Sequence, residues 1–113
     1  MLKNLVLAAL AIFALITSAA QAKIIHVPAD YPTIQAGIDA AVSGDQVVVA
    51  AGIYEENIVL KSGVDVLGAG ADVTTIVATG SSLYAVYART VTNMELNGFT
   101  ISDGYYKIVD KRY

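Results

Sequence analysis

The sequence predicts an all-β fold in which short strands stack as the coils of a parallel solenoid, with one helix in front of them. The first observation is a series of short β-branched runs between residues 44 and 77, at Val47–Val49, Ile58–Leu60, Val64–Leu67 and Thr74–Val77. The second is that small turn residues separate these runs, so the crossover helices of a doubly wound sheet do not fit between them. Coils of this kind bury a core only by stacking on one another.

The beginning of the chain has the three parts of a secretory signal peptide. Lys3 supplies positive charge, Leu5–Ile16 is an apolar run, and Ala20-Gln21-Ala22 is a small-residue cleavage site, so we expect cleavage between Ala22 and Lys23. A membrane anchor is the alternative, but the apolar run is shorter than the roughly 20 residues that span a bilayer. With residues 1–22 removed, we expect a secreted, periplasmic or cell-surface protein that has no membrane segment.

Composition limits the size and the partners of this domain. The full chain has 113 residues, with 7 basic and 10 acidic side chains and no cysteine. The part after the signal peptide is long enough for one small domain. The acidic balance argues against nucleic acid binding, which needs a basic surface. Without cysteine, no disulfide can stabilise the exported domain.

The mature part begins with a short extended run at Ile24–Val27, and a single amphipathic helix follows it. Pro32 or Thr33 begins the helix, and Gly44 marks its end. Helical spacing places four apolar side chains on one face: Ile34, Ile38, Ala41 and Val42. One helix ahead of many strands cannot cover both faces of a sheet, but it can cover one end of a coil.

The second half of the chain contains further strand patterns. In Ser81–Arg89, simple alternation places Tyr84 and Tyr87 on opposite faces. Asn97-Gly98 lies between two short strands and has two interpretations: a hairpin turn of an antiparallel sandwich with a binding role, or a corner of a coiled parallel sheet. The short, regular spacing of the strands favours the corner. The tail, Tyr105–Tyr113, has no turn signal and no clear period.

Much of the chain matches an opening found in a known superfamily. The matching residues are Tyr31-Pro32-Thr33-Ile34-Gln35, Ile38-Asp39-Ala40-Ala41, Gly44-Asp45, Gly52, Tyr54, Glu56-Asn57, Gly63, Gly68, Gly70 and Thr74-Thr75-Ile76. This opening resembles the N-terminal part of right-handed parallel β-helix proteins of the pectin-lyase-like superfamily, the pectinesterase-like proteins in particular. The segment VTNMELNGFTISDG, residues 91–104, is similar to a repeat strand of these proteins.

The resemblance implies a domain organisation and a set of inward-facing residues. Residues 23–104 would form the N-terminal cap and first coils, with Thr33–Val42 as the capping helix, and residues 105–113 would be an irregular tail. Asp65 would point outward. The side chains expected to point into the coil are Val47, Val49, Ile58, Leu60, Val64, Val66, Ile76, Phe99 and Ile101.

The resemblance also bears on activity. In pectinesterases and pectate lyases the catalytic carboxylates, arginine and glutamines lie on later coils, and no position here matches those motifs. We therefore assign no catalytic residue and expect a non-catalytic exported module with a surface or polysaccharide-contact role. The alternative is an inactive N-terminal fragment of a pectinesterase or polysaccharide lyase. The last coil would expose a sheet end, which predicts self-association.

Other candidate sites have simple structural interpretations. Gly68-Ala69-Gly70 lacks the third glycine of a dinucleotide loop, because Val73 stands there, so these glycines are interpreted as corners. His26 has no nucleophile beside it. Glu55 and Glu56 are expected in a solvated turn.

No cofactor is expected. Ca²⁺ binding stays an alternative that would require the separate acids Asp65, Asp72 and Glu95 to meet at one place.

Aromatic side chains are the remaining candidates for ligand binding. Four tyrosines could stack on sugar rings if they share one groove: Tyr84, Tyr87, Tyr105 and Tyr106. The alternative is that they pack between coils and cover sheet edges.

Overall fold

The computed structural model describes residues 21–109, without the side chains of Tyr106, Ile108 and Val109. Its strands form three sheets, and every strand pairing in them is parallel. Sheet A contains β1 (Ile24–Val27), β2 (Gln46–Val49), β5 (Asp65–Gly68) and β8 (Leu96–Asn97). Sheet B contains β3 (Gly52–Glu55), β6 (Thr74–Val77) and β9 (Thr100–Ser102). Sheet C contains β4 (Ile58–Val59), β7 (Tyr84–Arg89) and β10 (Tyr105–Val109).

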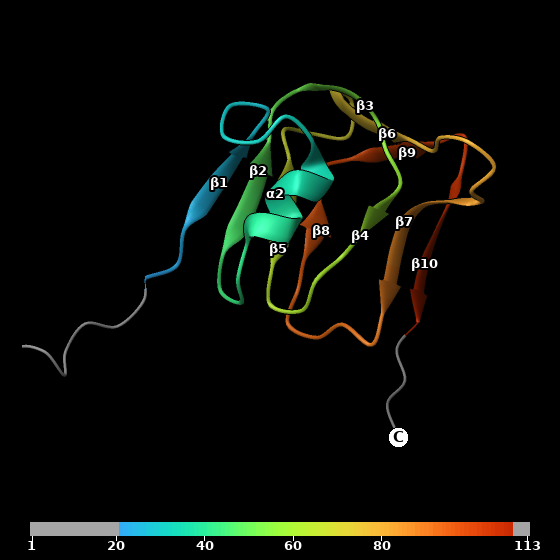
Figure 1. Ribbon diagram of the computed structural model, residues 1–113. Coiled ribbons are helices and arrows are strands. Elements are labelled where there is room, and N and C mark those ends of the chain that lie inside the picture. Colours follow the sequence, from blue (N-terminus) through green and yellow to red (C-terminus); the bar gives the residue numbers. More distant parts are fainter. Residues whose placement is uncertain (1–20, 110–113) are drawn as a thin grey trace, which may run out of the picture.

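After β1, the chain visits sheets A, B and C in the same order three times, as Figure 1 shows. This is a parallel β-helix, so the predicted solenoid is confirmed. The antiparallel sandwich is wrong. Asn97-Gly98 is a corner, because Gly98 has a φ of 82° and the chain passes there from β8 in sheet A to β9 in sheet B.

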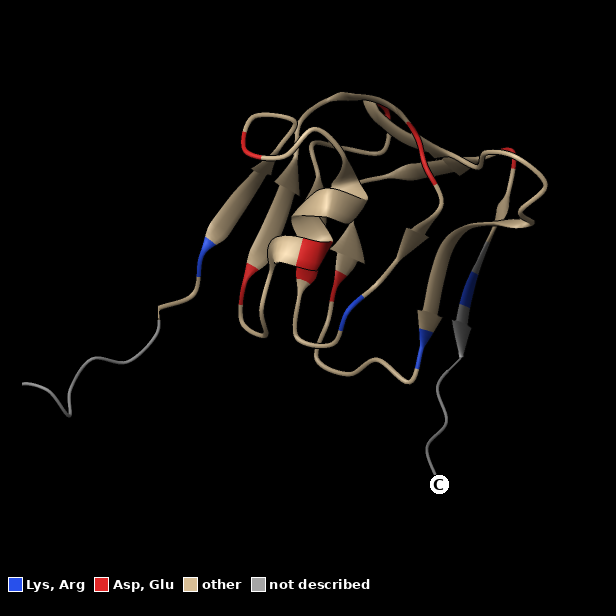
Figure 2. Cartoon of the chain, in the orientation of Figure 1, with Lys and Arg blue, Asp and Glu red and all other residues tan. Residues whose placement is uncertain are grey.

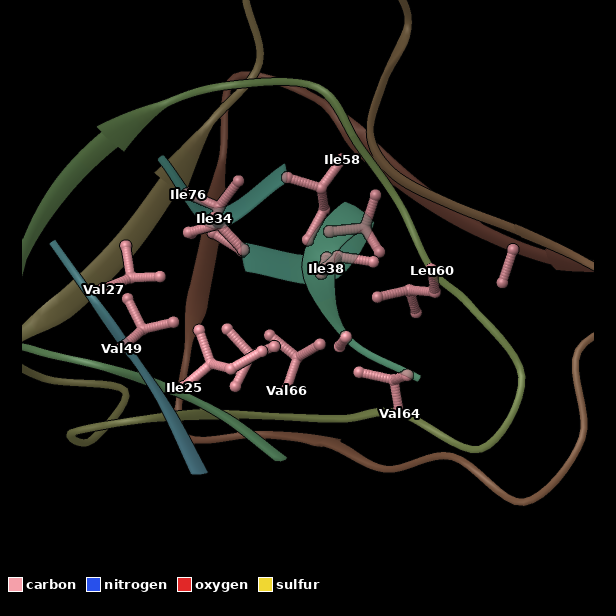
Figure 3. Close-up of a cluster of buried hydrophobic side chains, with 14 of the residues drawn as sticks. Ile25, Val27, Ile34, Ile38, Val49, Ile58, Leu60, Val64, Val66 and Ile76 are labelled. Atoms are coloured by element: carbon pink, nitrogen blue, oxygen red, sulfur yellow. The ribbon is translucent and has the colours of Figure 1, made fainter. Parts of the chain in front are cut away.

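The predicted helix covers one end of the coil. Helix α2 (Ile34–Ala40) begins after Thr33, whose hydroxyl accepts a hydrogen bond from the Ala36 N–H. It contacts β1, β2 and β4, and in Figure 1 it lies in front of the coil interior. The buried side chains of Ile34 and Ile38 extend from α2 into the core, as Figure 3 shows.

The coil interior is filled with aliphatic side chains. Valine and isoleucine dominate this cluster because β-branched side chains fit the pleated inner faces of strands. The predicted inward-facing residues are confirmed: Phe99 and Ile101 are partly buried and pack against the cluster, and the other seven are buried. Asp65 is half-buried beside Val64 and Val66, which are buried.

Charged side chains bond both ends of α2. The Glu56 carboxylate accepts hydrogen bonds from the Ile34 N–H at 2.9 Å and the Gln35 N–H at 3.1 Å. At the other end, Lys61 Nζ donates to the Ala41 carbonyl at 2.6 Å. The signs of both charges match the helix dipole. Glu55 is exposed, as expected, but it is the last residue of β3, and Glu56 is half-buried, so the expected solvated turn is wrong for both.

Two further local expectations differ from the structure. β3 was not predicted, because Gly52 and Tyr54 interrupt its β-branched pattern. Tyr105–Val109 is a strand paired with β7, although the sequence predicted an irregular tail there. Leu5–Ile16, most of the predicted signal peptide, lies outside the described residues, as does the end of the tail, residues 110–113. Within residues 21–109, no helix has the length and hydrophobicity needed to cross a membrane.

Candidate functional site

A β-bulge in β7 places Tyr84 and Tyr87 on one face. Tyr105 pairs with Tyr84, whereas Tyr106 pairs with Val86, so Ala85 is an extra residue in β7. Ala85 and Val86 are both buried. The two tyrosines therefore both point outward, and the simple alternation expected from the sequence is wrong at this point.

The tyrosines form a compact aromatic group on the outside of sheet C. The ring centroids of Tyr84 and Tyr87 are 6.2 Å apart and the rings are inclined at 48°. Lys107 Nζ lies 5.6 Å from the centroid of the Tyr84 ring, within the range of a cation–π contact. Tyr105, in register with Tyr84, is 70% exposed. We call Tyr84, Tyr87, Tyr105 and Lys107 the sheet-C outer face.

Positive charge accompanies these rings. Arg89 is exposed and follows Tyr87 by two residues in β7, so strand alternation places it on the same side. In Figure 2 blue segments lie at β7 and on β10 in sheet C, further blue segments lie before β1 and after β4, and red segments are spread over the coil, including the corner between β9 and β10. A protein with a net charge of −3 thus carries a small cationic and aromatic surface. Arg89 and Lys107 were not among the residues predicted from the sequence; their two-residue spacing from Tyr87 and Tyr105 was the available signal.

Tyr106 is the fourth predicted glycan-contact residue, and Ala22 and Lys23 form the predicted cleavage site. The Tyr106 backbone pairs with β7, and its side chain lies outside the described part of the chain. Ala22 and Lys23 are exposed and precede β1. The structure therefore brings together Tyr84 and Tyr87, with Tyr105 beside them on the neighbouring strand.

The acids considered for Ca²⁺ do not form a cluster. Asp65 Oδ1 accepts a hydrogen bond from the Glu95 N–H at 2.9 Å, whereas Asp72 is exposed in the turn before β6. In residues 21–109, no three His, Cys, Asp or Glu side chains are grouped to hold a metal ion. The backbone N–H of exposed His26 donates to the Asp30 carboxylate.

Two groups away from this face have shifted pKa values. Hydrogen bonds from the backbone N–H groups of Val42 and Lys23 lower the pKa of Asp45. Burial, and then the charge of Glu56, raise the pKa of Tyr54, whose hydroxyl donates to the Ala50 carbonyl at 2.7 Å. Both groups have clear structural partners, so neither points to acid–base catalysis.

The end of the coil opposite α2 has a shallow pocket. Strands β8, β9 and β10 are the last strands of their sheets. The pocket has a volume of about 540 Å³, and its apolar lining includes Met94, Leu96, Phe99 and Ile101. We call these four side chains the open end.

Comparison with known proteins adds no identity: no protein family, curated protein or solved structure matches the chain.

Proposed function

We propose that this chain is an exported β-helix module of the pectin-lyase-like type that binds acidic polysaccharide without catalysis. The observation that carries the proposal is the sheet-C outer face, where Tyr84 and Tyr87 share one side of a strand and Lys107 lies over Tyr84. Tyrosine rings offer flat apolar surface to the C–H faces of sugars, and their hydroxyls stay in contact with water. The positive charges of Lys107 and Arg89 attract the carboxylates of uronic acids.

The rigidity of the coil supports this role. Tyr84 and Tyr87 stand on a strand with hydrogen-bonded neighbours on both sides, β4 and β10. Ala85 and Val86 anchor the bulge in the core. The rings therefore lose little conformational freedom when a ligand binds, which favours affinity.

The test is a calorimetric titration of the protein with oligogalacturonate and with a neutral oligosaccharide of the same length. We expect binding of the acidic oligomer, weakened about tenfold or more in a Tyr84→Ala/Tyr87→Ala variant, a loss of about 1.4 kcal/mol. Lys107→Ala should weaken the acidic ligand more than the neutral one. Tyr31→Ala, which removes an exposed tyrosine between β1 and α2, is the matched control.

Two results would overturn the proposal. Equal binding by wild type and the double tyrosine variant would remove the face from consideration. Turnover of a uronic acid polymer by the purified chain would show that the module is catalytic.

We also propose that the open end pairs with the open end of a second copy. Its strands have backbone groups available on one side, and the pocket beside them is mostly apolar, with Glu95 and Asn97 also in its lining. In each copy, α2 covers the other end of the coil. A symmetric contact between two copies would therefore join their open ends.

The alternative function is that of a non-catalytic N-terminal segment of a carbohydrate-active enzyme, a pectinesterase or polysaccharide lyase. The apolar open end favours it, because a further coil would cover Leu96, Phe99 and Ile101. Translation of the DNA beyond the Tyr113 codon in all forward frames decides this point. Further coils with paired Asp and Arg residues support the enzyme, and their absence removes it.

A further inference from the structure

Asp45 is a buried carboxylate at the beginning of β2, and it holds the first residue of the coil. Its side chain is 3% exposed. Oδ2 accepts a hydrogen bond from the Val42 N–H at 2.9 Å, and Oδ1 accepts one from the Lys23 N–H at 2.9 Å. The Lys23 carbonyl in turn accepts the Gln46 N–H at 2.9 Å. The parallel pairing of β1 with β2 thus begins beside a negative charge.

The nitrogen atom bonded to Asp45 belongs to the peptide bond that the signal sequence predicts to be cleaved. Gln21, Ala22 and Lys23 are exposed and lie in neither a helix nor a strand. Before cleavage this nitrogen is a neutral amide with one N–H. After cleavage it is an α-amine, whose ordinary pKa of about 7.7–8.0 makes it largely cationic at neutral pH.

We propose that cleavage between Ala22 and Lys23 creates an ion pair between the new α-ammonium group and Asp45, which fixes β1 onto β2. A signal peptidase catalyses the reaction with one water molecule. The C–N bond breaks, the water oxygen forms the Ala22 carboxylate on the released leader, and the Lys23 nitrogen takes up protons to become an ammonium group. This proposal depends on export of the protein, which belongs to the proposed function, and not on polysaccharide binding.

The surroundings of Asp45 keep its carboxylate ionised. Lys23 and Lys61 are the cationic side chains whose charges act on it, and both lower its pKa. Asp65 on β5 is the neighbouring acid: its N–H donates to the Asp45 carbonyl, and its carboxylate accepts the Glu95 N–H. A carboxylate already ionised and directed at the new N-terminus needs no rearrangement to bind an ammonium group.

The first measurement is the N-terminal sequence and intact mass of the protein after expression with its leader in a secreting host. We expect Lys23 to be the first residue. A mature chain that begins at another residue would overturn the proposal, whatever the protein binds.

The second measurement separates the charge from the hydrogen bond. Two chains beginning at Lys23 are compared, one with a free α-amine and one with an acetylated α-amine, which restores an amide N–H. At pH 6 we expect the free amine to raise the melting temperature by roughly 4–8 °C relative to the acetylated chain. In an Asp45→Asn background this difference should disappear.

The dependence on pH gives a readout that does not require the Asp45 variant to fold. The ion pair raises the pKa of the α-amine in the folded state, so its stabilisation is present below pH 8 and is lost as the pH rises through that raised pKa. The advantage of the free amine should therefore be absent at about pH 11. The side chains of Lys23, Lys61 and Asp65 are the same in both chains, so their contributions cancel in the difference between the two melting temperatures. Equal melting temperatures at pH 6, or an advantage that persists at pH 11, would overturn the ion pair.

Discussion

The side-chain amide of Gln35 bonds the backbone of Val59 in the way that a neighbouring strand would. Gln35 Oε1 accepts the Val59 N–H at 2.7 Å, and Gln35 Nε2 donates to the Val59 carbonyl at 3.4 Å. Val59 belongs to β4, the first strand of sheet C, whose outer edge would otherwise be unpaired. A glutamine on the capping helix therefore satisfies the edge of a strand with one donor and one acceptor.

Replacement of Gln35 by alanine should destabilise the protein by about 0.5–1.5 kcal/mol, because both backbone groups of exposed Val59 exchange the amide for water. The measurement is urea unfolding followed by circular dichroism. Gln46→Ala is the matched control: Gln46 is half-buried, and its side chain makes no hydrogen bond with the described residues. Equal unfolding midpoints for the two variants would contradict a role of the amide in protecting the edge.

Glu56→Gln should cost about 1–2 kcal/mol, because the helix N-terminus loses a negative charge and one of two acceptors. The shape of the side chain is preserved, so the loss reports charge and hydrogen bonding. Glu55→Gln is the control, since Glu55 is adjacent, exposed and of the same type. We expect its effect to be within about 0.5 kcal/mol of zero. Denaturant unfolding of both variants gives the comparison, and a larger loss in Glu55→Gln would refute the assignment.

Gly98→Ala should destabilise the coil for two reasons. The φ of 82° is unfavourable for alanine, and an added Cβ would collide with the carbonyl group of Gly68 in the coil below. We expect a loss above about 2 kcal/mol. Gly80→Ala separates the two causes, because Gly80 has a φ of 65° but no atom within 4 Å of the added Cβ. Gly80→Ala should lose about 1 kcal/mol of stability, measured by thermal unfolding. Equal losses of stability in the two variants would exclude the collision.

Stability in acid should depend on Asp45. Its folded-state pKa is lowered below the ordinary value of 3.8 by hydrogen bonds from Val42 and Lys23. A lowered pKa means that the stabilisation is present above pH 3.8 and is lost as the pH falls through the folded-state value. Asp45→Asn should therefore have a flatter stability profile between pH 5 and pH 2, measured by urea midpoints. Asp72→Asn makes the same replacement at an exposed aspartate away from this hydrogen-bond set and is the control.

The sequence predicts the parts of the fold that depend on local pattern. The β-branched runs identify most strands, and the spacing of Ile34 and Ile38 identifies the buried face of the cap. The sequence cannot show that Glu56 would reach the N-terminus of α2, because this contact depends on how the coil folds back. Its charge alone indicates a solvated turn.

The candidate site was predicted less completely than the fold. Period-two alternation separates Tyr84 from Tyr87, and only the bulge at Ala85 reunites them. A bulge is a property of two paired strands, and the partner here is β10, which the sequence predicted as irregular. Lys107 could not be placed over Tyr84 without that strand. The errors at β7 and in the tail therefore have one cause.

Pairing of two copies through the open end should appear in light scattering after size exclusion. We expect the measured mass to rise with protein concentration toward that of a dimer. Ile101→Lys should keep the protein monomeric, because a charge on β9 would have to be desolvated at the contact. Ile53→Lys is the matched control: it introduces the same change in the same sheet, but Ile53 lies on β3 and is 74% exposed.

Circular dichroism of both lysine variants checks that the β-rich fold is preserved. A dimer that survives Ile101→Lys in a folded protein would refute pairing through the open end. A wild-type protein that is monomeric at all concentrations would refute self-association itself. Because β8, β9 and β10 offer ladder groups to a partner, aggregation without a defined dimer would instead indicate that another coil normally covers this surface.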